Sequence, residues 1–367
     1  MILGIAIRRL GKYGIKLKDI NFWANKKVFV TGNTGFKGSW LSIWLNHLGA
    51  RVNGYSLKPV TKPSLFEEAD IKKSFKTHFL DIRNYDKLRK EVSSFDPEIV
   101  FHLAAQPLVR YSYLLPKETF DTNVLGSLNI LECVRKIKKI KSSIIITTDK
   151  VYDNAKNKIF KETDKLGGVD PFSSSKVCVE HLFSSYVNSF FKKSQNQKLA
   201  TVRAGNVIGG GDYSKDRLIP DIYRFAKKNK KIILRNPNST RPWQHVLEPL
   251  SGYLLLAEKL SKNKLNKVYQ SWNFGPNISN CKSVKYIADY FAKFLKLKIK
   301  IAKNNSKDFK PETSYLRLSN YKARKVLKWH PKWSLNKSLN IILEWNNNPK
   351  SKDYKKMCEN QIRNYLS

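Results

Sequence analysis

The feature that most constrains the fold is a glycine-rich segment near the N-terminus. Gly32, Gly35 and Gly38 follow directly after the apolar run 28–30, and apolar residues at helical spacing follow at 40–48. Glycine lets a backbone turn tightly and come close to a phosphate group, which a helix N-terminus then attracts. Glycine turns also occur for purely structural reasons, but the order strand, glycine turn and helix favours a dinucleotide site. The residues that we expect to contact the dinucleotide are Gly32, Thr34, Gly35, Phe36, Lys37 and Gly38.

Short apolar runs recur along the first 205 residues, with helical stretches between them. They lie at 28–31, 51–55, 78–80, 99–103, 143–147 and 199–203. Strands that alternate with helices predict a parallel sheet with helices on both faces and right-handed crossovers. We therefore expect an α/β chain with a Rossmann-type doubly wound parallel sheet and a smaller mixed α/β C-terminal substrate lobe.

The rhythm of the pattern changes after about Asn206. Three consecutive glycines at 209–211 and several prolines mark loops, and the pattern is irregular from there to the C-terminus. The predicted parts are a basic N-terminal extension (1–20), a dinucleotide-binding domain (21–205, with segments near 241–275), a substrate-binding lobe (206–240 and 276–350) and a C-terminal tail (351–367).

The composition of the chain limits the kinds of ligand and partner that we expect it to bind. The formal net charge is +40, but lysines are spread along the whole chain and no nucleic-acid-binding signature accompanies them, so we expect no nucleic-acid partner. A positive field would still attract an anionic sugar nucleotide. We expect no membrane span and a cytoplasmic protein, because no apolar run is long enough to cross a bilayer and the N-terminal charges follow its apolar stretch. The four cysteines form no C-x-x-C pair and the histidines are scattered, so we expect no metal site.

Polar residues follow two of the predicted strands. Thr148, Asp149 and Lys150 come after the run 143–147, where an open α/β sheet places its active site. Gathering a hydroxyl, a carboxyl and an ammonium there favours function over the alternative, a loop in which Asp149 is a cap that accepts backbone hydrogen bonds. Asp81 and Ile82 would meet an adenine edge or form a plain turn, and Leu103 and Ala104 would line a cofactor path or pack the core. The second strand ends without an acidic residue for a ribose hydroxyl.

Longer stretches carry a family resemblance. At 30–40, 101–110, 203–212, 216–220 and 241–255 the chain resembles the extended short-chain dehydrogenase/reductases and, within them, the CDP-glucose 4,6-dehydratases. The resemblance covers residues 21–345. Asp149-Lys150 is typical of the CDP-glucose enzymes, whereas the related dTDP-glucose dehydratases carry Asp-Glu. The resemblance implies NAD as cofactor, CDP-glucose as substrate and a homo-oligomer, either a dimer or a tetramer.

The resemblance also implies residue roles. In this family NAD oxidises C4 of the glucosyl ring, water is lost across C5–C6, and hydride returns to C6. Thr148 would bind the C4 oxygen, Asp149 would be the acid for water loss, and Lys150 would assist removal of the C5 proton. Lys176 would hold the nicotinamide ribose. The residues implied in substrate binding are Gln106, Asn206, Arg217, Arg241 and Tyr315, whereas Arg203 is expected to brace the sheet.

The position of the family's catalytic tyrosine departs from the family pattern. The segment that should read Tyr-x-x-x-Lys has Phe172 in place of the tyrosine, four residues before Lys176. General-base catalysis commonly contributes ~10²–10⁴-fold, so we expect binding to persist and C4 oxidation to be slow. Phe172 is consistent with a change introduced to trap substrate, with a naturally silent binding protein, or with another base. Tyr111 and Tyr113 lie in a predicted loop and would either face the sugar or pack. An epimerase or reductase acting on another nucleotide sugar is the remaining alternative.

Overall fold

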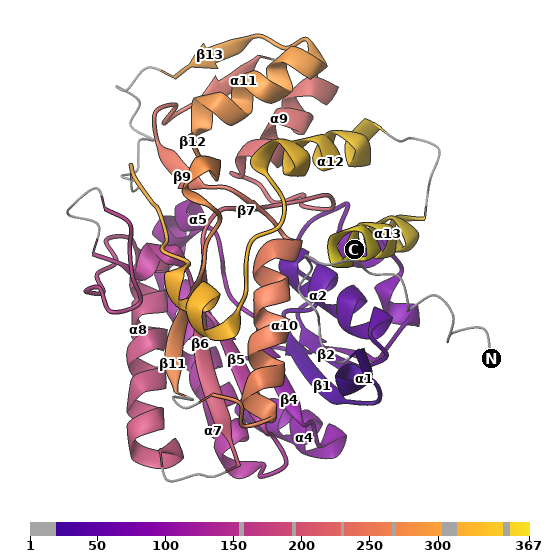
Figure 1. The fold of residues 1–367 in the computed structure, drawn as a ribbon, viewed down its shortest axis with the longest axis vertical. Coiled ribbons are helices and arrows are strands. Elements are labelled where there is room, and N and C mark those ends of the chain that lie inside the picture. Colours follow the sequence, from indigo (N-terminus) through magenta and orange to yellow (C-terminus); the bar gives the residue numbers. More distant parts are fainter. Residues whose placement is uncertain are drawn as a thin grey trace.

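The structure is a computed structural model that describes residues 20–153, 158–192, 196–228, 231–265, 269–302, 314–347 and 353–367. The predicted basic extension therefore lies outside the described residues, apart from its last position. Within them, seven parallel strands form a central sheet in the order β11-β6-β5-β4-β1-β2-β3 (Figure 1). The strands are β1 (Lys27–Thr31), β2 (Arg51–Ser56), β3 (Thr77–Phe79), β4 (Ile99–His102), β5 (Ser142–Ile146), β6 (Lys198–Ala204) and β11 (Gln270–Phe274). The predicted Rossmann-type sheet is confirmed.

Helices cover both faces of the sheet. The main covering helices are α2 (Phe36–His47) and α10 (Leu247–Ser261) on one face, and α4 (Tyr85–Phe95), α7 (Gly126–Lys136) and α8 (Pro171–Tyr186) on the other. The residues of strand β1 are apolar at successive positions because both faces of the sheet are covered. Val28 and Val30 pack into the first cluster and Phe29 into the second, because successive side chains of a strand point to opposite faces.

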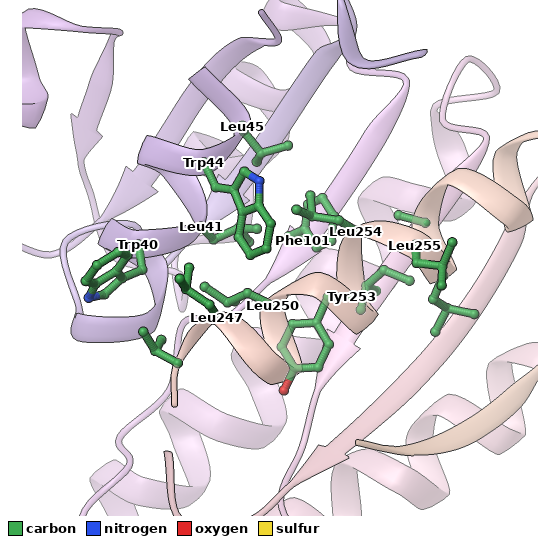
Figure 2. Packing of buried hydrophobic residues seen from close by; sticks show 14 of the residues in the cluster. Trp40, Leu41, Trp44, Leu45, Phe101, Leu247, Leu250, Tyr253, Leu254 and Leu255 are labelled. Carbon is green, nitrogen blue, oxygen red and sulfur yellow. The ribbon is translucent and has the colours of Figure 1, made fainter. Parts of the chain in front are cut away.

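The contact between α2 and α10 forms the centre of the first cluster. Figure 2 shows Trp44 of α2 beside Leu250 and Leu254 of α10, with Phe101 of β4 behind them. Trp44, Leu250 and Leu254 are completely buried. Because α10 comes from residues after 240, this packing joins the later part of the chain to the glycine-containing first unit.

A second lobe stands above the sheet, at the top of Figure 1. Its helices are α9 (Leu218–Lys227), α11 (Val284–Leu295) and α12 (Leu335–Asn347). Short paired strands accompany them: β7 (Val207–Ile208) with β10 (Gln244–His245), β8 (Ile232–Leu234) with β13 (Ile299–Ile301), and β9 (Thr240–Pro242) with β12 (Cys281–Ser283). A separate apolar cluster, which includes Ile222, Ile287 and Leu339, holds the lobe together.

The C-terminal segment is not a simple tail. It forms α13 (Tyr354–Leu366), which packs against α2. Cys358, Ile362 and Tyr365 are buried because their spacing places them on one face of the helix. The remaining α-helices are α1 (Ile20–Trp23), α3 (Leu65–Glu68), α5 (Val109–Leu114) and α6 (Pro116–Phe120). No described helix has both the length and the apolar composition to span a membrane.

Candidate active site

A pocket of about 520 Å³ lies at the carboxyl ends of the sheet strands and extends to the second lobe. This is where ligands bind in open α/β sheets, and the volume suits a small-molecule site. Eighteen of the predicted site residues line it: Gly32, Thr34, Gly35, Phe36, Lys37, Gly38, Asp81, Ile82, Leu103, Ala104, Thr148, Asp149, Lys150, Phe172, Lys176, Asn206, Arg217 and Arg241. The fold therefore gathers the predicted cofactor, catalytic and substrate residues around a single cavity.

The glycine turn has a shape that only glycine fits. Gly32 has a φ of +70°, and a Cβ atom there would lie 2.7 Å from the main-chain nitrogen of Ala104. A Cβ atom on Gly38 would overlap the main-chain oxygen of Gly32. Gly35 caps α2 without a side-chain hydrogen bond, so the amide groups of the first helical turn remain available to a ligand. The turn therefore has the backbone geometry that a dinucleotide pyrophosphate requires.

The side of the pocket next to β2 and β3 is polar but has little acidic character. Thr34 Oγ1 lies 2.8 Å from Ser56 Oγ and donates to the main-chain oxygen of Leu57 at 3.0 Å. Asp81 reaches the pocket, yet its carboxylate also accepts hydrogen bonds from Arg83, which lower the pKa of Asp81. Asp81 therefore forms a turn with Arg83 and also lines the pocket, and its contact with an adenine edge stays a prediction.

The end of β5 supplies a hydroxyl and a carboxylate in contact. Thr148 Oγ1 donates to Asp149 Oδ1 at 3.1 Å and also caps the short 3₁₀ turn over Asp149–Val151. Only 2% of the Asp149 surface is exposed. Its second oxygen, Oδ2, is buried and has no hydrogen-bond partner among the residues that the structure describes. Since Thr148 provides the cap, Asp149 is not needed for that role, and its Oδ2 lies buried beside Gly205.

Helix α8 brings Phe172 and Lys176 to the same pocket. Asp170 caps the helix by accepting from the Ser173 amide at 2.9 Å. Lys176 Nζ donates to the main-chain oxygen of Ile146 at 3.1 Å, at the end of β5. Burial, with a contribution from Lys37, lowers the pKa of Lys176 to about 7. Phe172 is buried and presents a ring with no ionisable group.

Three more cations line the cavity. Lys37 is partly buried, and desolvation together with the charge of Arg217 lowers the pKa of Lys37 to about 8. Arg217 donates to Asp212 Oδ2 at 2.9 Å and remains one-third exposed. Arg241 is buried and lines the same cavity. Arginine donates paired hydrogen bonds, so these side chains suit a phosphate-bearing ligand.

Two predicted substrate residues do not line the pocket. Gln106 is buried, and its amide nitrogen donates to Thr119 Oγ1 at 2.9 Å, within the protein interior. Tyr315 forms an isolated bridge with Thr240, and the guanidinium of Arg317 lies 4.6 Å from the centre of its ring. Both residues contact protein groups, and neither lines the cavity in which we expected the substrate.

The two tyrosines considered as replacement bases also lie elsewhere. They belong to helix α5 and not to a loop, and neither lines the pocket. Tyr111 donates through its hydroxyl to Glu118 Oε2 at 3.0 Å. The predicted role of Arg203 is confirmed, because its Nε donates to Glu180 Oε1 at 2.8 Å inside the protein.

An ion cluster at the pocket was not predicted. Asp216 Oδ1 lies 3.0 Å from Arg110 Nη1 and 3.1 Å from Arg235 Nη1, and all three residues line the cavity. Arg110 lies in the first turn of α5 and Asp216 precedes α9, so the cluster links the sheet unit to the second lobe. Arg110 and Asp216 both belong to stretches that carry the family resemblance, which was the signal available in the sequence.

Comparison with known proteins identifies the family. Residues 29–342 match the family described as GDP-mannose 4,6 dehydratase. The CDP-glucose 4,6-dehydratase of Salmonella typhimurium (strain LT2) is 48% identical over 334 residues, which cover 89% of this chain and 92% of that protein. The chain belongs to the GDP-mannose 4,6-dehydratase family. The predicted assignment to the dehydratases of the extended short-chain dehydrogenase/reductase group is confirmed, and this member of the family is an enzyme.

Two solved structures of other enzymes share the fold of this family member. A dTDP-glucose 4,6-dehydratase from Bacillus anthracis, in complex with NAD, aligns with a TM-score of 0.74 at 21% identity, over 90% of this chain and 99% of that one. A UDP-glucose 4-epimerase from Thermotoga maritima, with UDP-glucose, aligns with a TM-score of 0.74 at 20% identity, over 89% of this chain and 100% of that one. At these identities the likeness establishes the architecture.

Proposed function

We propose that this chain converts CDP-D-glucose to CDP-4-dehydro-6-deoxy-D-glucose, with NAD as a recycled cofactor. The observation that carries the proposal is the 48% identity to the Salmonella CDP-glucose 4,6-dehydratase over 89% of the chain. The gathering of Thr148, Asp149, Lys150 and Lys176 in one cavity with the glycine turn supports it.

The pocket fits NAD. The turn over 32–38 is tight, because Gly32 lies so close to the backbone of Ala104 that a Cβ atom has no room. Such a turn lets a pyrophosphate come close to the main-chain amides. Asp81 and Ile82 would hold the adenosine end, Leu103 and Ala104 the middle of the cofactor, and Lys176 the nicotinamide ribose. When bound, NAD accepts hydride from C4 of the sugar and returns it to C6.

The chain's own residues then have distinct tasks in the dehydration. Thr148 binds the C4 oxygen, and the carboxyl group of Asp149 protonates the C6 hydroxyl as the acid for water loss. Lys150 assists removal of the C5 proton, which the 4-keto group makes acidic. Burial of Thr148 and Asp149 excludes water from the reacting groups and strengthens their electrostatic interactions.

The second lobe would bind the nucleotide end of the substrate. Asn206, Arg217 and Arg241 line the cavity where that end would lie, and their polar groups match a diphosphate. We retain the predicted division into a dinucleotide-binding domain and a substrate-binding lobe, and the predicted homo-oligomer, as parts of this proposal. Size-exclusion chromatography with light scattering tests the oligomer, since a monomeric mass would contradict it.

Phe172 favours slow turnover. A tyrosine beside a lysine takes the C4 hydroxyl proton as a phenolate, whereas a phenylalanine has no atom to do so. The proposed enzyme therefore binds CDP-glucose and oxidises it slowly. The same residue favours the second candidate, a nucleotide-sugar-binding protein without turnover.

One experiment separates the candidates. The protein with added NAD is incubated with CDP-glucose, and the sugar is followed by nuclear magnetic resonance and mass spectrometry. Loss of one water with appearance of a 4-keto-6-deoxy sugar supports the dehydratase. A C4 epimer of unchanged mass would identify an epimerase instead. Binding by calorimetry without any product, in the parent and in Phe172→Tyr alike, would identify a silent binding protein.

A further inference from the structure

The pocket lacks the group that should accept the proton of the C4 hydroxyl. Among its described lining residues there is no histidine and no glutamate, and position 172 is phenylalanine. The two tyrosines that line it, Tyr55 and Tyr213, donate their hydroxyl protons to the main-chain oxygen of Asp81 and to Glu68.

The acceptors nearest the end of β5 are the carboxylate of Asp149 and the amine of Lys176. Lys176 already donates to the main-chain oxygen of Ile146. Asp149 differs from Lys176 because it already accepts a hydrogen bond from a hydroxyl, that of Thr148, and can therefore receive a proton through that hydroxyl.

The contact between Thr148 and Asp149 has the geometry of a proton relay. Thr148 Oγ1 donates to Asp149 Oδ1 at 3.1 Å, and both residues are buried. A hydroxyl that donates its proton to a carboxylate can accept another proton from a third group, because its oxygen carries two lone pairs. Asp149 Oδ2 has no hydrogen-bond partner among the described residues.

We propose that Thr148 and Asp149 relay the proton of the C4 hydroxyl in place of the missing tyrosine, and that Asp149 then delivers this proton to the C6 hydroxyl. The inference rests on the proposed function. As C4 loses hydride with its electron pair to the nicotinamide cofactor, the C4–OH proton passes to Thr148 Oγ1. The proton of Thr148 passes to Asp149 Oδ1, leaving a C4 ketone and a neutral carboxylic acid.

The second step uses the acid that the first step makes. After the C5 proton passes to the neutral amine of Lys150, Asp149 gives the proton on Oδ1 to the C6 oxygen, the C6–O bond breaks, and water leaves. Asp149 returns to the carboxylate in which it began. With a tyrosine base, Asp149 would have to gain its proton in a separate step. In the relay, Asp149 is protonated during the oxidation itself. The Thr148–Asp149 contact therefore supplies the base function that Phe172 cannot provide.

The decisive variant is Asp149→Asn, made in the parent and in the Phe172→Tyr protein. The readout is the near-ultraviolet absorbance of reduced nicotinamide in a single turnover with CDP-glucose. We expect Asp149→Asn to slow cofactor reduction in the parent by at least ~100-fold. In the Phe172→Tyr protein, the same change should leave reduction fast but block water loss, so reduced cofactor accumulates.

A second pair of variants tests the hydroxyl. In the parent, Thr148→Val should slow reduction as Asp149→Asn does, whereas Thr148→Ser should keep the rate within about threefold. In NAD-free protein, calorimetry should give CDP-glucose a roughly threefold to tenfold tighter Kd than its 4-deoxy analogue. Thr148→Val should remove that preference, which measures the contact without turnover.

The outcomes separate two failures. If Asp149→Asn in the parent reduces the cofactor at the parent rate, the relay is overturned and Lys176 becomes the base to test. If Thr148→Val keeps the preference for CDP-glucose over the 4-deoxy analogue, the contact at C4 is overturned. If Phe172→Tyr itself yields no 4-keto sugar, the proposed function fails. Thermal unfolding of each variant identifies a folding defect, and Thr148→Ser then carries the test.

Discussion

Arg203 and Glu180 form an ion pair in the protein interior, with Arg203 Nε 2.8 Å from Glu180 Oε1 and no more than 3% of either side chain exposed. Glu180 also accepts from Thr147 Oγ1 at 2.6 Å, immediately before Thr148 on the chain. It lies one helical turn after Lys176 on α8. This pair therefore holds the active-site end of β5 against α8.

Breaking this pair should destabilise the protein. In Arg203→Met, Glu180 keeps a buried charge without its cation, and we expect the free energy of unfolding to fall by about 3–5 kcal/mol. Urea unfolding followed by circular dichroism measures it. Asp289→Asn is the control, because the Lys285–Asp289 pair is half exposed and should matter by about 1 kcal/mol or less. Equal effects of the two changes would contradict the assignment.

Restoring the family tyrosine should restore activity. We expect Phe172→Tyr to raise turnover of CDP-glucose by at least about tenfold, because Lys176 stands one helical turn away and its charge stabilises a phenolate. General-base catalysis of this size corresponds to ~3–5 kcal/mol of the barrier. The Kd for CDP-glucose, from calorimetry, should stay nearly unchanged. A variant that binds as well but turns over no faster would show that oxidation is not limited at position 172.

Family membership and the local residues of the pocket point to different cofactors, NAD⁺ and NADP⁺ respectively. No acidic residue follows β2, and Lys58 lines the cavity there, where a cation favours a 2′-phosphate. We nevertheless expect NAD⁺ to bind more tightly than NADP⁺, because the family resemblance implies NAD. Fluorescence titration of the parent and of Lys58→Ala with each cofactor measures the two Kd values in both proteins. A clearly tighter Kd for NADP⁺ that weakens in Lys58→Ala would reverse the assignment.

The nucleobase should be discriminated as well. We expect CDP-glucose to bind more tightly than UDP-glucose or dTDP-glucose, since Asp149-Lys150 and the second-lobe stretches resemble the CDP-glucose enzymes. Calorimetry with the three sugar nucleotides measures the order of Kd values. CDP and UDP without sugar serve as controls for the base alone. Equal affinities, or a reversed order, would show that the substrate is another nucleotide sugar.

Two buried histidines should make the fold acid-sensitive. Burial lowers the pKa of His245 to about 3, and burial with a smaller effect of Lys176 lowers the pKa of His102 to about 3. Between the unfolded value of 6.5 and about 3, the unfolded state binds more protons, so stability falls as the pH falls through this range. At pH 5 each histidine should account for roughly 2 kcal/mol of lost stability.

Urea unfolding at pH 7 and pH 5 tests this sensitivity. His245→Gln should flatten the difference between the two pH values, because glutamine does not titrate. His181→Gln is the matched control, since His181 is exposed on α8. A pH dependence that His245→Gln leaves as steep as in the parent would show that other groups cause the acid sensitivity.

The sequence by itself determined the sheet, the glycine turn and the four-residue spacing of Phe172 and Lys176. These features are local: apolar runs, backbone conformation and helical periodicity are properties of neighbouring residues. Only the tertiary structure decided which side chains face the cavity. It brought Arg110 beside Asp216, 106 positions away, and it bonded Gln106 to Thr119 inside the protein. It also buried one face of α13 against α2, because such contacts depend on the packing of distant segments.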